Sequence, residues 1–409
     1  MSFATKVFTV ALTTACVLIT TVAAEDESDD PAQSLARSND AFAIDLYETL
    51  TRDEDNVFFS PFSINAALAM TYAGAGGDTA DQMRDVFSWQ LPDGDLHRTF
   101  GKITDQLGSD DDSTFQLHIA NSIWGQKDYN FHQDYLDTVE DNYGAPLRRA
   151  DFKSDPDQMR KKINQWVEKH TEEKIKDLMP KGSISPLTRL VLANAIYFNA
   201  RWANTFDENS TTEDTFTTSD GTETKTDMMQ QTDRFGYMDN DMLKILELPY
   251  DGSETSMFVL LPKEKADLDQ IEDAISPKNL DAWIQKLKQS RVEVRLPKFK
   301  LKKKFMLNDK DMLPEMGMPD AFDPNRANFD EMAEEDEELY IAAAVHQAYV
   351  DVDEKGTEAA AATGIGVSAT AAPAGEPEIF HADRPFIFLI RDRQTGCTLF
   401  MGRLADPTR

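Results

Sequence analysis

Cysteine is nearly absent from this sequence, which carries Cys16 and Cys397 and no others among its 409 residues. Two cysteines are too few for a disulfide-stabilised scaffold or for a zinc site built from thiolates. The six histidines are scattered, without a His-Glu-x-x-His motif or a pair at metal-ligand spacing on one helix, so we expect no metal site. Stability must therefore come from burial of apolar side chains in a large core.

Basic residues are also scarce relative to acidic ones. The chain has 42 lysine and arginine residues against 73 aspartate and glutamate residues, and its formal net charge is −31. Such a surface repels nucleic acids, sulfated polysaccharides and anionic lipids, because each would add negative charge to negative charge. We therefore expect no nucleic-acid partner.

Sequence motifs of common enzymes are missing as well. There is no Gly-x-Ser-x-Gly nucleophile elbow and no phosphate-binding loop, and Gly-Ala-Gly-Gly at residues 74–77 does not complete a dinucleotide-binding motif. Carboxylate pairs suited to acid–base catalysis cannot be singled out among 73 candidates. Nothing argues for catalysis or for a bound cofactor, and we predict neither an enzyme nor a cofactor.

The N-terminal segment has the pattern of a cleaved secretory signal. Lys6 precedes an uncharged run over residues 7–24, and the sequence then turns acidic. The alternative is a membrane anchor, but a run of 18 residues diluted by five threonines is barely long enough to span a bilayer. We predict a signal peptide at residues 1–24 and a secreted, extracellular protein at residues 25–409. After cleavage we expect no attachment to the membrane.

Two side chains gain meaning in a secreted protein. Asn209-Ser210-Thr211 is an acceptor sequence for N-glycosylation, so we predict glycosylation at Asn209. Cys397 is the one thiol that remains after signal cleavage, and we predict a buried small residue rather than a reactive thiol.

Hydrophobic periodicity predicts one large α+β domain. No linker rich in glycine, serine or proline divides the chain, and no repeat of fixed period occurs. Residues 190–198 form a near-continuous apolar run, which is typical of a strand covered on both faces. A hairpin turn is predicted at residues 219–221. The patterns predict helices at 32–50, 156–172, 266–289 and 306–317, a short strand leading into a buried helix at 57–73, and strands at 115–123, 190–198, 243–249, 256–261, 291–301, 340–353, 379–390 and 396–404.

One connection between predicted strands does not look like a loop. Residues 354–377 are more than compact domains normally leave without structure. One side of this segment, if extended, is apolar or small and uncharged (Thr357, Ala359, Ala361, Thr363, Ile365, Val367 and Ala369), and the other is small or polar. This alternation is typical of a half-buried strand, although the segment must also serve as a connection.

Five motifs, in family order, give the chain a resemblance to the serpins, from about residue 32 to residue 407. They are Asn-Val-Phe-Phe-Ser-Pro-Phe-Ser-Ile at 56–64, Asn-Ala-Ile-Tyr-Phe-Asn-Ala-Arg-Trp at 194–202, Val-Glu-Val-Arg-Leu-Pro-Lys-Phe at 292–299, the hinge at 346–362, and Phe-His-Ala-Asp-Arg-Pro-Phe-Ile-Phe at 380–388. The resemblance implies an α+β fold in a single large domain, with three β-sheets, about eight or nine helices and an exposed reactive-centre loop at about residues 356–378.

The resemblance also implies a function. A serpin of the inhibitory kind is a suicide substrate of a serine protease: the protease cleaves the loop and forms an acyl-enzyme, and the loop then inserts into the largest sheet as a new strand. In inhibitory relatives the scissile bond follows the fourteenth residue after the hinge glycine. Counting from Gly356 places it between Thr370 and Ala371. Small residues there favour a covalent complex with an elastase-like or subtilisin-like protease, whose specificity pocket is small.

The family's other site residues carry over by position. A hydrogen-bonded cluster beneath the sheet opening matches Ser60, Ser63, Asn194 and His346, where His346 is expected to be structural and not a catalytic base. An upper opening matches Trp202, Lys298 and Glu354, the last two as an ion pair that holds the hinge. The hinge itself matches Glu354, Gly356, Thr357, Glu358, Ala359, Ala360, Ala361 and Ala362.

A second interpretation is a non-inhibitory serpin that acts as a carrier, chaperone or storage protein. Such relatives usually carry bulky, charged or proline residues in the hinge, whereas residues 359–362 are all alanine here. Heparin is an unexpected partner, because the segment before the strand predicted at 115–123 reads Gly-Ser-Asp-Asp-Asp. We expect a monomer whose acidity steers a basic protease toward the loop.

Overall fold

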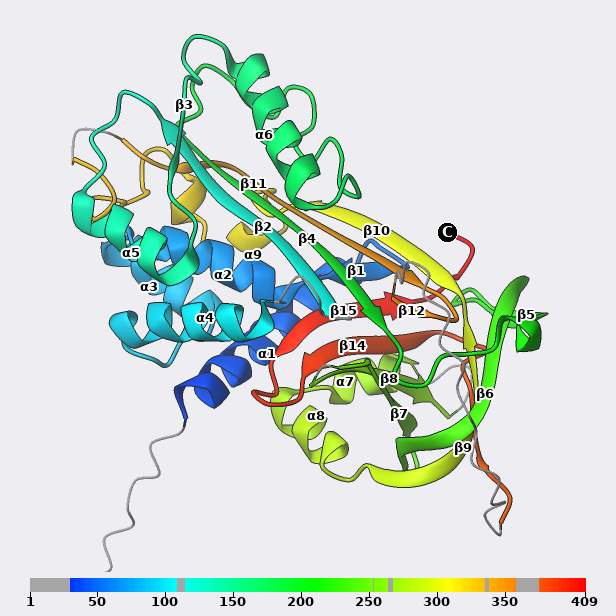
Figure 1. Ribbon diagram of the computed structural model, residues 1–409. Helices are drawn as coiled ribbons and strands as arrows, with labels where there is room; N and C mark the ends of the chain where they lie inside the picture. The colour runs from blue at the N-terminus through cyan, green and yellow to red at the C-terminus, as the bar shows by residue number, and fades with distance from the viewer. Residues whose placement is uncertain (1–29, 109–114, 253, 264–267, 335–337, 358–374) are drawn as a thin grey trace, which may run out of the picture.

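The computed structural model describes residues 30–108, 115–252, 254–263, 268–334, 338–357 and 375–409. These residues form an α+β fold of two hydrogen-bonded sheets and surrounding helices (Figure 1). The predicted signal peptide, hinge residues Glu358 and 359–362, and the predicted bond between Thr370 and Ala371 lie outside the described residues. Among the described helices, none combines the length and the apolar character needed to cross a membrane.

The six-stranded sheet positions the candidate site. Its strands lie in the order β10 (Phe299–Met306), β11 (Ile341–Val352), β12 (Gly356–Thr357), β4 (Leu190–Arg201), β2 (Phe115–Gln126) and β3 (Arg148–Ala150). The β11–β4 pair is parallel and the β2–β4 pair is antiparallel, so the sheet is mixed.

The nine-stranded sheet forms the other half of the fold. Its hydrogen-bonded path is β1 (Val57–Phe59), β15 (Thr398–Leu404), β14 (Phe386–Asp392), β8 (Thr255–Pro262), β7 (Leu243–Pro249), β6 (Glu223–Asp239), β9 (Lys288–Pro297) and β13 (Glu378–His381), with β5 (Thr212–Thr217) paired to β6. The resemblance implied three sheets. The described strands join into two because the 17-residue β6 pairs with β9 along most of its length and with β7 near its end.

Nine α-helices occur among the described residues, in agreement with the expected number. They are α1 (Pro31–Leu50), α2 (Pro61–Tyr72), α3 (Gly77–Val86), α4 (Asp93–Leu107), α5 (Gln133–Tyr143), α6 (Pro156–His170), α7 (Leu268–Ala274), α8 (Pro277–Ile284) and α9 (Leu313–Met316), with short 3₁₀ turns η1 (Glu208–Ser210) and η2 (Asp320–Phe322). Helix α6 lies on one face of the six-stranded sheet, and α2 and α4 lie on the other (Figure 1).

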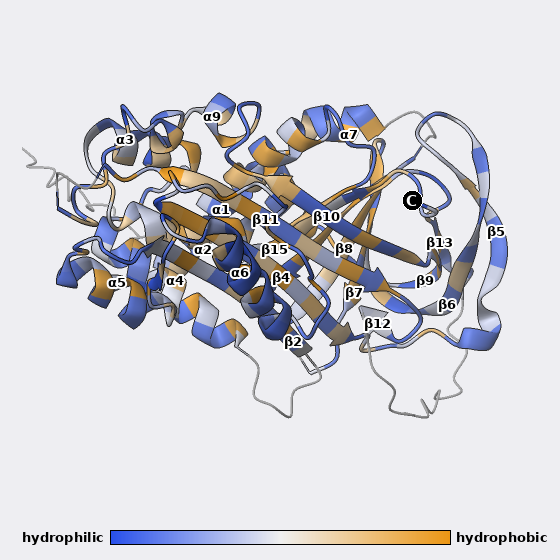
Figure 2. Cartoon of the chain, turned by 90° about the horizontal axis from the view of Figure 1, so that it is seen from above, coloured by the Kyte–Doolittle hydropathy of each residue, from blue (hydrophilic) through white to orange (hydrophobic). Residues whose placement is uncertain are grey.

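Strand β4 explains how both faces of this sheet are covered. Its residues alternate between two hydrophobic cores: Leu192 and Ile196 belong to the large core shared with α1–α5, and Val191 and Ala195 to the smaller core beneath α6. This is the two-sided burial that the apolar run predicted. The outward surface of α6 is mostly hydrophilic, as Figure 2 shows, because its apolar side chains turn toward the sheet.

Four element predictions were wrong in their boundaries. The strand predicted at 291–301 is divided at Lys298 into β9 of the nine-stranded sheet and β10 of the six-stranded sheet. The helix predicted at 266–289 is two helices, because Ser276 caps α8 by accepting from the backbone N–H of Asn279 at 3.2 Å, and β9 begins at Lys288. The helix predicted at 306–317 is reduced to α9, since β10 continues to Met306 and residues 307–312 form turns and bends. The strand predicted at 379–390 is divided into β13 and β14 ahead of Pro385, which has no N–H to donate.

Candidate functional site

The candidate site is the place where β4 and β11 separate. The two strands pair in parallel from Leu190 and Ile341 to Tyr197 and Tyr349. Beyond that point β12 lies between them, antiparallel to both: Thr357 pairs with Ala200 of β4 and with Val352 of β11. The first hinge residues are therefore already part of the sheet.

Gly356 occupies a position that no other residue type fits without movement. A Cβ atom there would lie 2.1 Å from the carbonyl oxygen of Ala200 and 2.7 Å from the Cα of Arg201. Both are backbone atoms of β4, so no side-chain rotation relieves the contact. Glycine allows the hinge to approach β4 closely.

Thr357 is the first hinge side chain to enter the core. It is fully buried, and its hydroxyl lies 2.8 Å from the hydroxyl of Tyr250. Thr357 belongs to the side of the segment whose residues are apolar or small and uncharged. The remaining residues of that face lie outside the described residues.

The expected ion pair at the upper opening is present. The Lys298 Nζ lies 2.9 Å from Glu354 Oε2, and the Glu354 side chain is only 8% exposed. The hydroxyl of Thr211 donates to the other carboxylate oxygen at 2.7 Å. Burial alone would raise the pKa of Glu354, but the hydrogen bonds from Lys298 and Thr211 outweigh it and lower that pKa below its ordinary value.

Trp202 binds the backbone of the hinge directly. Its indole Nε1–H donates to the carbonyl of Asp353 at 2.9 Å, and its backbone N–H donates to the carbonyl of Lys355 at 2.9 Å. The indole stacks on the ring of Tyr250, with centroids 4.6 Å apart. Trp202 thus connects the hinge to the residue that receives Thr357.

A tight turn at residues 353–356 completes this end of the site. The Asp353 carboxylate accepts from the backbone N–H groups of Lys355 and Gly356 at 2.8 and 3.2 Å. Sequence reasoning missed Asp353 and also Thr211, which is distant in sequence from the hinge. An Asp two residues before Lys-Gly is a turn signal, so Asp353 could have been found. No signal in the sequence pointed to Thr211.

The predicted cluster beneath the opening is assembled as expected. Ser63, Asn194 and His346 meet where α2, β4 and β11 come together: Asn194 Nδ2 donates to the carbonyl and hydroxyl oxygens of Ser63, both at 2.8 Å, and Asn194 Oδ1 contacts His346 Nδ1. Ser60 caps α2 by accepting from Ser63 N at 3.1 Å. Asn121 of β2 was missed, although its Nδ2 donates to the Ser63 carbonyl and its Oδ1 accepts from the Ser63 hydroxyl.

The contacts of His346 define its tautomer and exclude a role as a base. Its Nε2 accepts from the backbone N–H of Ser60 at 3.1 Å, so the proton resides on Nδ1 and is donated to Asn194. Burial lowers the pKa of His346 to about 3. The Ser60 hydroxyl donates to the carbonyl of Leu399 at 2.6 Å and is not activated by the imidazole. These contacts are those of a neutral, fully hydrogen-bonded histidine.

Cys397 and Asn209, which the sequence also singled out, lie outside this site. Cys397 is fully buried, and burial raises the pKa of its thiol, so it is not a reactive thiolate. Asn209 lies in the exposed turn η1, where its side chain donates to Asp207 at 2.9 Å. Within the described ranges, no group of three or more histidine, cysteine, aspartate and glutamate side chains is placed to hold a metal ion.

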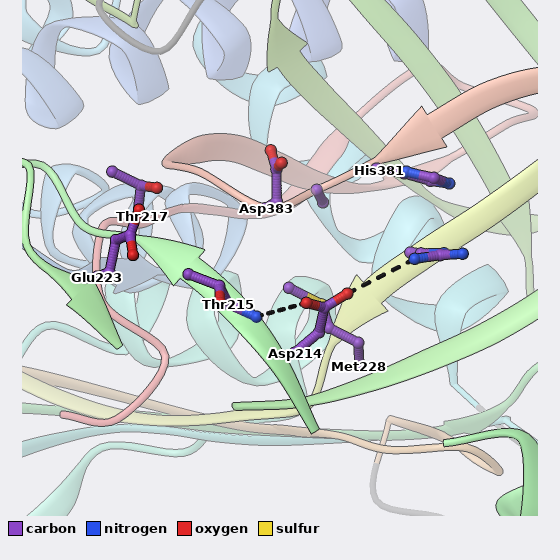
Figure 3. A pocket seen from close by; sticks show the side chains of 9 residues that line it. Asp214, Thr215, Thr217, Glu223, Met228, His381 and Asp383 are labelled. Atoms are coloured by element: carbon purple, nitrogen blue, oxygen red, sulfur yellow. Dashed lines mark hydrogen bonds and ion pairs between the residues drawn. The ribbon is translucent and has the colours of Figure 1, made fainter. Parts of the chain in front are cut away.

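The far end of the loop is anchored beside a polar cavity of about 240 Å³ (Figure 3). Strand β13 begins at Glu378 and pairs in parallel with β9. His381 Nε2 of β13 lies 3.1 Å from Glu293 Oε1 of β9, and Arg295 pairs with Asp214 of β5 at 3.5 Å. These contacts hold together the strands that fix the C-terminal end of the loop.

Comparison with known proteins identifies relatives along almost the whole chain. A family model described as Serpin (serine protease inhibitor) matches residues 37–407. An uncharacterized serpin-like protein of Methanosarcina acetivorans is 39% identical over 91% of this chain and 86% of its own, and leukocyte elastase inhibitor A of Rattus norvegicus is 38% identical over 92% and 100%. The crystal structure of human thyroxine-binding globulin complexed with thyroxine matches with a TM-score of 0.83 at 28% identity, covering 93% of this chain and 100% of that chain.

Proposed function

Because this chain belongs to the serpin family, we propose that it is a secreted inhibitor of serine proteases that traps its target by inserting its cleaved loop into the six-stranded sheet. The observation that carries the proposal is the position of Thr357. It pairs with both β4 and β11 at the end where these strands separate, whereas the rest of the two strands pair directly with each other. Insertion would extend a strand that has begun.

The register of β12 defines where each inserted residue would lie. Continuing from the Thr357–Ala200 pair along β4 brings Thr363 opposite Asn194, and continuing from the Thr357–Val352 pair along β11 brings the same residue opposite His346. Asn194 and His346 are partners in the closed sheet. The two ladders therefore agree, and a new strand would replace the β4–β11 pairing without a shift of register.

The same register matches the alternation in the loop. Ala359 and Ala361 would lie opposite Phe198 and Ile196, whose side chains point into the large core. The opposite side of the inserted strand carries residues 360, 362, 364 and 366, which are alanine or glycine and would lie beneath α6. Small side chains on this side can enter without displacing the helix far.

New strand hydrogen bonds would favour insertion. In this register the strand would end near Val367, opposite Leu190 at the start of β4, and Thr370 would lie just beyond it. A strand of this length forms on the order of ten new hydrogen bonds, each contributing about 1 kcal/mol net. The total is on the order of 10 kcal/mol before strain and the entropy of ordering the loop are subtracted, and it acts in the direction that would carry an attached protease along the sheet.

The proposed target has a small specificity pocket. Small residues around the bond between Thr370 and Ala371 support an elastase-like or subtilisin-like protease, and the similarity to a rat leukocyte elastase inhibitor supports the same class. Secretion is supported by the signal-like residues 1–24 and by the exposed acceptor Asn209.

Incubation of the full chain with elastase tests the proposal. We expect a covalent complex that survives SDS, cleavage after Thr370 or within a residue or two of it, and a large rise in thermal stability of the cleaved inhibitor. Trypsin and chymotrypsin serve as matched controls, for which no complex is expected. Cleavage without a complex and without a gain in stability would overturn the proposal and favour a carrier, the kind of function that the thyroxine complex of the human relative represents.

A further inference from the structure

Strand β3 pairs with β2 at the edge of the six-stranded sheet (Figure 1). A cavity of about 210 Å³ lies beside these two strands. Its walls come from α2, α4, β2, the end of α5, β3 and α6. Five cavities of the described surface can be compared by their linings. Each of the other four is lined by at least three carboxylates, whereas this one has none. In a chain with 73 acidic residues, a cavity free of them is unusual.

Arg148 is the one permanently charged residue in this lining. Its guanidinium lies over the rings of Trp166 and Trp124, 4.7 and 5.6 Å from their centroids. Among the described residues, no carboxylate forms an ion pair with it and no acceptor takes a hydrogen bond from its side chain. The adjacent Arg149, which points to the opposite face of the strand, donates to the carbonyls of Lys127 and Tyr129.

A second donor, in a residue of the cavity wall, also has no acceptor. The indole Nε1 of Trp166 is buried, and no described group accepts its hydrogen. Partial burial lowers the pKa of Arg148, and because the guanidinium stays charged, its lost hydration is a cost that a bound anion would offset. Cation–π contacts offset part of this cost, but they do not satisfy the N–H donors of the fork.

We propose that this cavity binds a small organic carboxylate with an apolar body. The carboxylate would accept two hydrogen bonds from the Arg148 fork, and the body would contact Ala66, Met70 and Ile119. A dry cavity of about 150 Å³ holds benzene, so the space here suits an aromatic monocarboxylate. A planar bidentate acceptor uses the geometry of arginine better than a spherical anion does.

The cavity is connected to the sheet opening through Asn121. This residue lines the cavity and also holds Ser63 in the cluster beneath the opening. A ligand bound between α2, β2 and α6 would favour the closed arrangement of these elements and slow insertion. This consequence rests on the proposed function, whereas the binding itself does not.

Calorimetric titration of the intact full chain with benzoate tests the binding. We expect saturable binding of benzoate, much weaker binding of the neutral isostere benzamide, and little binding of acetate, which lacks the ring. Arg148→Gln is expected to weaken benzoate binding about tenfold or more, since it removes a charged hydrogen-bond donor pair. The matched control Arg149→Gln changes the neighbouring arginine on the other face and should leave the affinity unchanged.

Each other outcome decides against the proposal. Equal binding of benzoate and benzamide would show that no anion is recognised, and equal losses in Arg148→Gln and Arg149→Gln would reduce the effect to overall charge. If Arg148→Gln does not fold, Arg148→Lys keeps the charge, removes the planar fork and should still weaken benzoate binding several-fold. The rate of complex formation with elastase should fall at saturating benzoate. An unchanged rate with intact binding would refute only the connection to the sheet.

Discussion

Replacement of Gly356 by alanine should expel the hinge from the sheet. The added Cβ would meet two backbone atoms of β4, one at 2.1 Å, and neither can rotate away. The chain can avoid this clash by lifting residues 356 and 357 out of the sheet. That movement costs the pairing of Thr357 with β4 and β11, its hydrogen bond to Tyr250 and the bond from Asp353 N to the carbonyl of Gly356.

The magnitude follows from the contacts that are lost. Three or so hydrogen bonds at about 1 kcal/mol each correspond to a loss of about 3 kcal/mol in the free energy of unfolding. Insertion after cleavage also requires residue 356 to lie against β4, so the variant should be cleaved by elastase and form little SDS-stable complex. Denaturant unfolding and gel analysis of complexes measure the two effects.

A matched control is available in the same chain. Gly94 lies in the first turn of α4, and a Cβ there would meet only the end of a flexible Arg98 side chain at 3.4 Å. Gly94→Ala should therefore be neutral or slightly stabilising. The reasoning is refuted if Gly356→Ala unfolds at the same denaturant concentration as the wild type and still traps elastase in full yield.

Three further predictions concern the same site. Lys298→Met should destabilise the protein by about 1–3 kcal/mol, because it leaves the nearly buried Glu354 carboxylate without its charged partner. The control Lys300→Met breaks an exposed ion pair with Asp351 and should cost less than about 1 kcal/mol. Equal losses in the two variants would contradict this reasoning. The Glu354 pKa is lowered by folding, so this stabilisation is complete above the ordinary value of 4.5 and is lost as the pH falls through the lower folded value. The pKa of His346 is about 3 in the folded state and about 6.5 in the unfolded state, so the unfolded state binds more protons between these values. The free energy of unfolding should therefore decrease as the pH is lowered through this window, by up to about 1.4 kcal/mol per pH unit. His346→Gln should flatten this dependence, and an unchanged slope in acid unfolding would argue against the assignment. Thr357→Arg cannot enter the fully buried hinge position, so gel analysis should find a cleaved substrate and no complex, and retained inhibition would overturn the insertion mechanism.

Patterns within a single segment were predicted well from the sequence. The helix at 32–50, the doubly buried strand at 190–198 and the hairpin turn at 219–221 all occur. Each depends on periodicity or turn chemistry among neighbouring residues, which the sequence displays directly. The boundary errors at 266–289 and 306–317 arose where apolar spacing continued across a cap or a turn that redirects the chain.

The site residues were found in part through the family resemblance. His346, Asn194, Ser63 and Ser60 were expected to meet, and they do. Asn121 and Thr211 were missed because each contacts the site only through the fold: Asn121 reaches Ser63 from a neighbouring strand, and Thr211 reaches Glu354 across 143 positions of sequence.

The sequence by itself determined that one segment could be a connection and also a strand, because its side chains alternate without a bulky or charged residue on the face that carries Thr357. Only the tertiary structure decided where that strand begins and in what register. Registers depend on hydrogen bonds between strands far apart in the chain, and a shift by one residue would turn every side chain to the other face. Here the pairing of Gly356 and Thr357 with β4 sets that register, and the close approach of Gly356 to Ala200 leaves no room for a larger residue.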